Sequence, residues 1–182
     1  MRHIKFVNSI LLIISLFLIT SCSDNSAMKP EDFKNKEPRL IIEEYLTGNV
    51  KAWGVLQNRS GKVTRQFSAD LNGSWDGKQL ILKEKFNWDD GEIQNREWTI
   101  TKIDENNYEG TAGDVVGKAI GYSYGPAFKF EYVLLVPVKG KEMKITFDDW
   151  IFKQDERVAI NRATMTKFGF KVAELTVVFV KD

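Results

Sequence analysis

The sequence predicts an all-β protein, an antiparallel up-and-down β-barrel of about ten strands, with a two-sheet sandwich as the alternative. Three observations lead to this prediction. From Arg39 onward, apolar residues recur mainly at every second position, which is the period of a strand with one buried face. Turn-forming pairs such as Asp76-Gly77 and Asp90-Gly91 interrupt this pattern every ~12–17 residues, as expected for long strands joined by hairpins. No stretch after Arg39 has the 3.6-residue period of an amphipathic helix.

The chain begins with the layout of a secretory signal peptide. Arg2 and Lys5 precede an apolar run over residues 10–19, and small residues follow it before Cys22. The run is shorter than the ~20 residues with which a helix crosses a bilayer. We therefore expect residues 1–21 to be removed as a signal peptide, with an uncleaved anchor or a buried first strand as the alternatives.

The tetrapeptide ITSC, residues 19–22, resembles the lipobox of bacterial lipoproteins. The resemblance implies that the Cys22 thiol carries a diacylglyceryl group and anchors the protein to the membrane, because two or three acyl chains bind far more firmly than one. In such lipoproteins, an aspartate directly after the cysteine is the usual signal for retention at the inner membrane. This chain has Ser23 at that position, so the resemblance implies an outer-membrane lipoprotein that faces the periplasm of the bacterial cell envelope. Residues 22–38 are expected to form the lipidated cysteine and a flexible tether, and residues 39–182 the barrel domain.

Composition excludes several classes of function. The chain has 26 basic and 25 acidic residues, and the signal peptide removes two of the basic ones, so the mature protein has no basic field for nucleic acid. The single histidine, His3, leaves with the signal peptide, and the single cysteine is consumed by lipid. Without imidazole or free thiol, the usual catalytic dyads and the usual zinc and haem ligand sets are excluded. We expect no cofactor and no metal, and do not favour an enzyme.

Turn signals and alternation together assign each strand and its inward face. The turns are expected at Gly48-Asn49, Ser60-Gly61, Asn72-Gly73 with Asp76-Gly77, Asp90-Gly91, Asn106-Asn107, Gly125-Pro126, Lys139-Gly140 and Asp155-Glu156. The segment 161–169 remains open between a strand, a bend and a helical turn. The expected inward residues are Val63, Arg65, Phe67, Ala69 and Leu71 of strand 62–71; Leu80, Leu82, Glu84, Phe86 and Trp88 of strand 79–88; Arg96, Trp98 and Ile100 of strand 92–103; Phe128, Phe130, Tyr132, Leu134, Val136 and Val138 of strand 127–138; Met143, Ile145, Phe147, Asp149 and Ile151 of strand 141–152; and Val158, Ile160 and Arg162 of strand 157–167.

Charged residues interrupt these apolar faces, and a buried charge is costly unless it is paired or hydrogen-bonded. One interpretation is that ion pairs plug one end of the barrel, or that bulges return these side chains to solvent. The other is a polar base in an apolar cup, where an arginine holds the anionic head group of a ligand. The candidate ligand-binding residues are Arg65, Glu84, Arg96, Asp149 and Arg162, together with Phe86, Trp98, Phe130 and Tyr132.

The glycine-rich segment GDVVGKAIG, residues 113–121, does not fit a phosphate-binding loop, because the glycine spacing is one residue short and Ala119 follows Lys118. Its glycines are expected at bends of the barrel wall or where backbones approach closely.

Three stretches resemble a family of bacterial lipoproteins known as domain of unknown function 3833. They are AWGVLQNRSGKVTRQF (52–67), GTAGDVVGKAIG (110–121) and FDDWIFKQDERVAINRATMTKFGFKVAELT (147–176). The resemblance covers essentially the whole mature domain. It implies a lipocalin-like barrel with a lipid or fatty-acyl role, and it identifies no catalytic or binding residue.

Three functions therefore stay open. The first is a barrel that binds a small hydrophobic or amphiphilic ligand such as a fatty acyl lipid. The second is a packed barrel that displays outer-face residues such as Trp150 and Phe152 to an envelope protein partner. The third is an enzyme on lipid substrates that uses Glu84 or Asp149 as acid or base.

Overall fold

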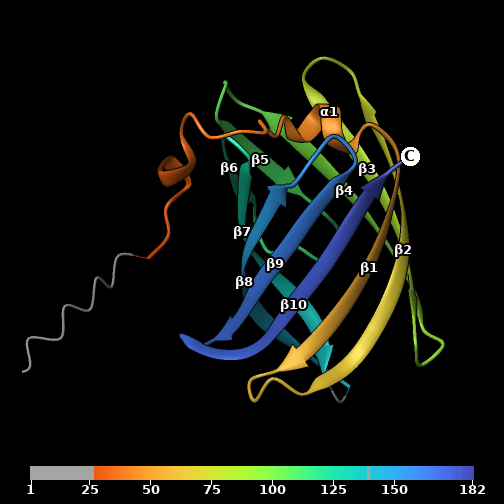
Figure 1. The fold of residues 1–182 in the computed structure, drawn as a ribbon. Coiled ribbons are helices and arrows are strands. Elements are labelled where there is room, and N and C mark those ends of the chain that lie inside the picture. Colours follow the sequence, from red (N-terminus) through yellow and green to blue (C-terminus); the bar gives the residue numbers. More distant parts are fainter. Residues whose placement is uncertain (1–26, 139) are drawn as a thin grey trace, which may run out of the picture.

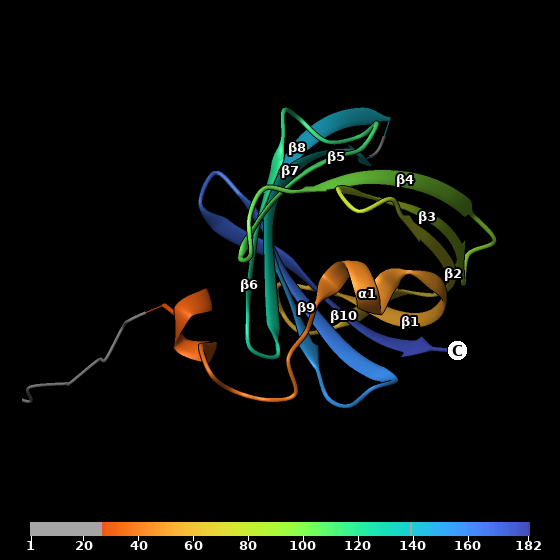
Figure 2. The ribbon, with the colours of Figure 1, turned by 90° about the horizontal axis from the view of Figure 1, so that it is seen from above.

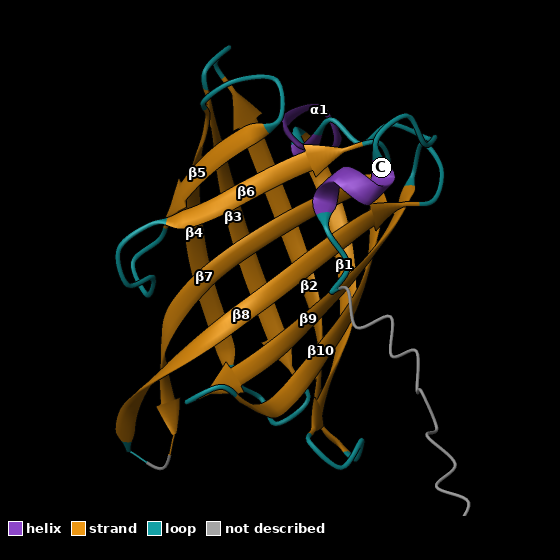
Figure 3. Cartoon of the chain, turned by 90° about the vertical axis from the view of Figure 1, so that its left-hand side faces the viewer, coloured by secondary structure: helices purple, strands orange, loops and turns teal. Residues whose placement is uncertain are grey.

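The protein is a closed antiparallel barrel, seen here in a computed structural model that describes residues 27–138 and 140–182 (Figure 1). Each strand pairs with the next along the chain, and the first pairs with the last to close the barrel. The strands run diagonally around the wall (Figure 3). This confirms the predicted up-and-down barrel and its strand number. The ten strands formed by the described residues are β1 (Gly48–Asn58), β2 (Val63–Trp75), β3 (Gln79–Trp88), β4 (Ile93–Lys102), β5 (Asn107–Thr111), β6 (Ala119–Tyr124), β7 (Ala127–Val138), β8 (Lys141–Lys153), β9 (Val158–Lys167) and β10 (Phe170–Lys181).

Burial of every second side chain along the strands stabilises the closed barrel. In β2, Phe67, Ala69 and Leu71 are buried and the residues between them are exposed. The same alternation runs through β7 and the first half of β8. Burying one large apolar side chain stabilises the folded state by roughly 1.5–3 kcal/mol. Rolling the sheet shut is the arrangement that buries one face of every strand and leaves no unpaired edge.

A short helix, α1 (Ile42–Leu46), lies across one end of the barrel (Figure 2). Its own residues Ile42, Tyr45 and Leu46 are buried in the core, so α1 closes that end. The Lys181 Nζ at the end of β10 donates to the carbonyl oxygens of Glu44, Tyr45 and Thr47 at 2.7–2.9 Å, which satisfies the free carbonyls at the helix C-terminus. The sequence did not predict this helix, because five residues are too few to show a helical period.

Strand β2 passes straight through the pair Asn72-Gly73, where a turn was expected. Gly73 serves a different purpose there. A Cβ atom at this position would collide with the backbone carbonyl of Leu46, the last residue of α1. Glycine in a strand commonly marks such a close backbone approach, so Gly73 lets the helix lie against the barrel wall.

The segment expected to be a tether contacts the barrel where the structure describes it. A 3₁₀ helix, η1 (Pro30–Phe33), places the Phe33 ring 5.9 Å from the Trp150 ring and 5.4 Å from the Phe152 ring. Trp150 is buried on the outer side of β8 as a result, so the structure does not bear out the expectation that it is displayed to a partner. Residues 1–21, expected to be a signal peptide, and Cys22 lie outside the described residues. No helix in the described ranges is long and apolar enough to cross a membrane.

Candidate ligand-binding cavity

The barrel encloses a cavity of about 800 Å³. Ile42 and Leu46 of α1 bound it at one end, and it reaches the opposite end, where Glu92 and Pro137 line it near the hairpins. Its size lies within the range of roughly 300–1,000 Å³ that is typical of ligand pockets. The interior is therefore not filled by its own side chains.

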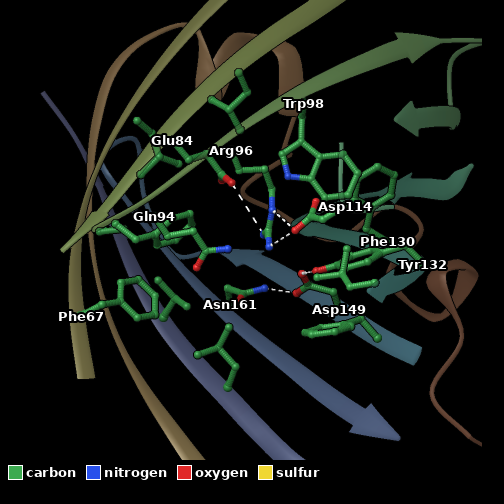
Figure 4. Close-up of a pocket in the computed structure, with 18 of the residues that line it drawn as sticks. Phe67, Glu84, Gln94, Arg96, Trp98, Asp114, Phe130, Tyr132, Asp149 and Asn161 are labelled. Atoms are coloured by element: carbon green, nitrogen blue, oxygen red, sulfur yellow. Dashed lines mark hydrogen bonds and ion pairs between the residues drawn. The ribbon is translucent and has the colours of Figure 1, made fainter. Parts of the chain in front are cut away.

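Aromatic side chains from the three strands β4, β7 and β8 form one wall of the cavity (Figure 4). The Trp98 ring of β4 lies 5.2 Å from Phe130 and 5.3 Å from Tyr132, both on β7. Tyr132 in turn stacks on Phe147 of β8 at 5.0 Å. Rings at these distances attract one another beyond simple burial, so these contacts stabilise the wall.

A buried charged group lies beside this aromatic wall, since Arg96 is two residues from Trp98 on the same face of β4 (Figure 4). Glu84 and Arg96 face each other across β3 and β4, with 4.0 Å between the Glu84 Oε2 and the Arg96 Nη1. Asp114, from the loop between β5 and β6, accepts hydrogen bonds from the Arg96 Nε at 3.0 Å and Nη2 at 2.7 Å (Figure 4). One guanidinium thus faces two carboxylates. The Glu84 Oε2 and the Asp114 Oδ1 are buried and have no hydrogen-bond partner.

A third carboxylate, Asp149 of β8, lies in the same interior and is fully hydrogen-bonded. The Tyr132 hydroxyl donates to its Oδ2 at 2.9 Å, and the Asn161 amide of β9 donates to its Oδ1. The same amide donates to the Trp150 carbonyl at 3.1 Å. These bonds fix the orientation of Asp149 toward the cavity.

Burial shifts the acidity of two of these groups. Desolvation raises the pKa of Glu84 from 4.5 to about 7, although the Arg96 charge works in the opposite direction. Desolvation also raises the pKa of Asp149 from 3.8 to about 6, and the hydrogen bonds from Tyr132 and Asn161 limit that rise. Glu84 is therefore poised to gain or lose a proton near neutral pH.

Arg65 lies at the mouth of the cavity and is already paired. Its Nη2 contacts the Asp90 Oδ1 and the Glu92 Oε2, each at 2.8 Å. Its guanidinium stacks over the Trp88 ring, with 4.0 Å from Cζ to the ring centroid. Within the described residues, no cluster of three or more His, Cys, Asp or Glu side chains is arranged to hold a metal ion.

The structure brings together all but one of the nine residues singled out from the sequence. Those that line the cavity are Arg65, Glu84, Phe86, Arg96, Trp98, Phe130, Tyr132 and Asp149. Their expected role in binding a ligand stays a prediction.

The expected inward orientation of Arg162 is wrong. Its side chain is 66% exposed and pairs with Glu174 on the outer surface. Arg162 lies opposite Trp150 and the next residue, Ala163, lies opposite Asp149, so β9 turns the other face inward from the one expected. Both faces of this strand carry apolar residues, and alternation alone therefore did not determine which is buried.

Two residues of the polar site were not among the candidates. Asn161 points inward because β9 turns toward the cavity the face opposite to the expected one. Asp114 lies in the loop between β5 and β6, and its neighbour Val115 forms a bridge to Leu134 of β7, which brings the loop against the wall. No local pattern marks a loop aspartate as a cavity residue, so only the folded arrangement identifies it.

Comparisons with known proteins identify the sequence family and find similar folds. The family described as Protein of unknown function (DUF3833) matches residues 16–181. Among curated proteins, none matches the sequence significantly.

Two solved structures have similar barrels. The S-type phycobiliprotein lyase CPES from Guillardia theta is 10% identical, with a TM-score of 0.58 over 77% of this chain and 90% of that one. A protein of the DUF3598 family from Nostoc punctiforme is 16% identical, with a TM-score of 0.60 over 81% of this chain and 51% of that one, so this chain spans about half its length. At such identities the likeness shows the fold alone. The family match covers nearly the whole sequence, and the chain therefore belongs to the DUF3833 family and has a lipocalin-like barrel fold.

Proposed function

We propose that the barrel binds a small amphiphilic ligand with a fatty-acyl type of apolar chain. The observation that carries this proposal is the cavity of about 800 Å³, which has an aromatic wall, a few buried polar groups and one end closed by α1. Apolar cavities with a small number of placed polar groups are the usual form of small-ligand sites. The likeness to other lipocalin-like barrels supports the proposal at the level of fold.

We further propose that the protein is anchored through a lipidated Cys22 in the outer membrane and faces the periplasm. The order of basic residues, apolar run, small residues and cysteine supports this. Metabolic labelling with an alkyne fatty acid tests the anchor, because wild type should incorporate the label and Cys22→Ala should not. Equal labelling of the two proteins would contradict it.

The ligand proposal is tested by filling the cavity. Ala52 of β1 is buried and lines the cavity, whereas its neighbour Lys51 is exposed on the outer face. Because a larger side chain at position 52 occupies ligand volume, Ala52→Trp should weaken binding of the apolar probe N-phenyl-1-naphthylamine about tenfold or more. Probe fluorescence measures the affinity.

Lys51→Trp is the matched control, since it adds the same side chain one residue away on the solvent side. It should bind the probe as wild type does. Native mass spectrometry of the wild type, extracted without added lipid, should also show a co-purifying apolar molecule. A folded Ala52→Trp protein with unchanged probe affinity would contradict binding inside the barrel.

An enzyme acting on a lipid substrate is the second candidate function. The observation that favours it is the buried Glu84, whose pKa of about 7 matches the requirement of a general acid or base. Glu84→Gln and Asp149→Asn separate this candidate from simple binding. An enzyme should lose its cellular role in both variants, whereas a binding protein should keep it, because a changed head-group preference still leaves the cavity able to bind.

A further inference from the structure

We propose that the cavity selects amphiphiles whose head group donates hydrogen bonds and carries no negative charge, with an alkyl ammonium preferred over a hydroxyl and a carboxylate bound most weakly. This inference rests on the proposed ligand-binding function and names the chemistry of the head group. It reverses the sequence-based expectation that an inward arginine holds an anion.

The charge balance of the interior is the first argument. Glu84, Asp114 and Asp149 contribute three carboxyl groups to the cavity, and Arg96 is the guanidinium among them. An anionic head group beside Arg96 would therefore also approach carboxylates in a medium that screens charge poorly. A cationic or neutral head group avoids this repulsion.

The arginines are the second argument, because both are already engaged. Arg96 directs its Nε and Nη2 to Asp114, so two of its three nitrogens hold a carboxylate of the protein itself. Arg65 holds Asp90 and Glu92 through its Nη2 and stacks on Trp88, while its Nε, at the mouth of the cavity, is buried without a partner. A ligand carboxylate would have to compete with these carboxylates of the protein itself.

The unmet acceptors are the third argument. The Glu84 Oε2 and the Asp114 Oδ1 are buried without a hydrogen-bond partner and lie on the two carboxylates that flank Arg96. A buried acceptor left without a donor is costly to the protein. A ligand N–H or O–H placed between them would satisfy these oxygens, whereas a carboxylate brings only further acceptors.

Three amphiphiles with the same chain test the proposal. Dodecylamine, 1-dodecanol and dodecanoate are titrated against the purified full chain with N-phenyl-1-naphthylamine as the displaced probe, at about pH 8, where the amine is protonated and the acid ionised. We expect dodecylamine to bind about tenfold more tightly than dodecanoate, with 1-dodecanol between them, because the interaction gained or lost is a charge-assisted hydrogen bond.

Two variants test which carboxylates are responsible for the selectivity between head groups. Glu84→Gln removes the charge while keeping the shape, so the ratio between dodecylamine and dodecanoate should fall by several-fold. Asp114→Asn should lower it in the same direction, and it provides a second measurement if Glu84→Gln folds poorly. Glu131→Gln is the matched control, since Glu131 lies between Phe130 and Tyr132 on β7 but its side chain is exposed on the outer face and pairs with Lys129.

Each outcome separates this inference from the proposed function. Equal displacement by all three amphiphiles, or tightest binding of dodecanoate, would overturn the head-group inference and leave the ligand-binding cavity standing. The head-group inference would also be overturned if none of the three amphiphiles displaced the probe although Ala52→Trp weakened probe binding. If Ala52→Trp left the affinity for the probe unchanged, that result would count against the ligand-binding function itself.

Discussion

Phe168 has a backbone conformation that its side chain does not favour. It forms, with Gly169, the two-residue turn between β9 and β10, and its φ is +51° where that of Gly169 is +79°. Hairpin turns with two positive φ values favour Asn, Asp or Gly at the first of these positions. The Phe168 side chain is 89% exposed, so packing does not compensate for the strain.

Replacing Phe168 by asparagine should therefore stabilise the protein. We expect Phe168→Asn to raise the free energy of unfolding by about 1 kcal/mol, because asparagine tolerates this region of the backbone. Thermal unfolding should show a midpoint higher by roughly 2–4 °C.

Phe170→Asn is the control for this prediction. Phe170 is 76% exposed and lies two residues later, at the start of β10, without a positive φ. The control removes the same kind of exposed ring without relieving backbone strain, so it should not stabilise. If both variants unfold at the wild-type temperature, the turn is not strained by Phe168.

At the scale of elements, strands were easier to predict than the pieces that complete the barrel. Alternation runs along most of β2, β3 and β7 and the first half of β8, and each of these strands turns the expected face inward. The exceptions lie at strand ends, where Val63 and Val138 are exposed. The helix α1 carries no such repeat, and its place is determined by contacts with distant residues such as Lys181. Its five residues gain their helical form from tertiary packing rather than from intrinsic propensity.

The contact between Gly73 and α1 leads to a second prediction. Gly73→Ala places a methyl group against the Leu46 carbonyl, so either α1 or β2 must move. Overpacking of this kind costs roughly 1–3 kcal/mol, which urea unfolding measures. The Tyr45 amide, which donates to the Ile41 carbonyl at 2.9 Å, should also exchange its hydrogen faster.

Ser74→Ala provides the comparison, since Ser74 is the next residue and is exposed on the outer face. Its stability should stay within about 0.5 kcal/mol of wild type. A Gly73→Ala protein as stable as Ser74→Ala, with wild-type exchange at Tyr45, would show that α1 does not need the close approach.

At the scale of the whole molecule, the sequence indicated that charges enter the barrel but not how they are arranged. Glu84, Arg96 and Asp149 follow from alternation along single strands. Their partners Asp114 and Asn161 come from a loop and from a strand with the opposite facing, and depend on how distant segments meet. The number of carboxylates around Arg96, which decides the chemistry of the cavity, therefore required the folded structure.

These buried carboxyl groups should make stability depend on pH in a defined direction. Because burial raises the pKa of Glu84 from 4.5 to about 7, the folded protein keeps a proton in this range that the unfolded chain has lost. The folded state binds more protons, so this contribution to stability is full below pH 4.5 and is lost as pH rises through about 7. Asp149 acts in the same direction between pH 3.8 and about 6.

Glu84→Gln isolates the first contribution, because glutamine resembles the protonated acid at every pH. The variant and wild type should have similar free energies of unfolding near pH 4.5, and the variant should become the more stable by up to about 3 kcal/mol near pH 8, where wild type must bury a carboxylate. Urea unfolding across this range measures the difference. Glu131→Gln, at an exposed position on the outer face, should keep a stability within about 0.5 kcal/mol of wild type. Parallel curves for Glu84→Gln and wild type would mean that Glu84 is as well solvated in the folded protein as in the unfolded chain. The unmet acceptor beside Arg96, on which the choice of head group depends, would then be absent as well.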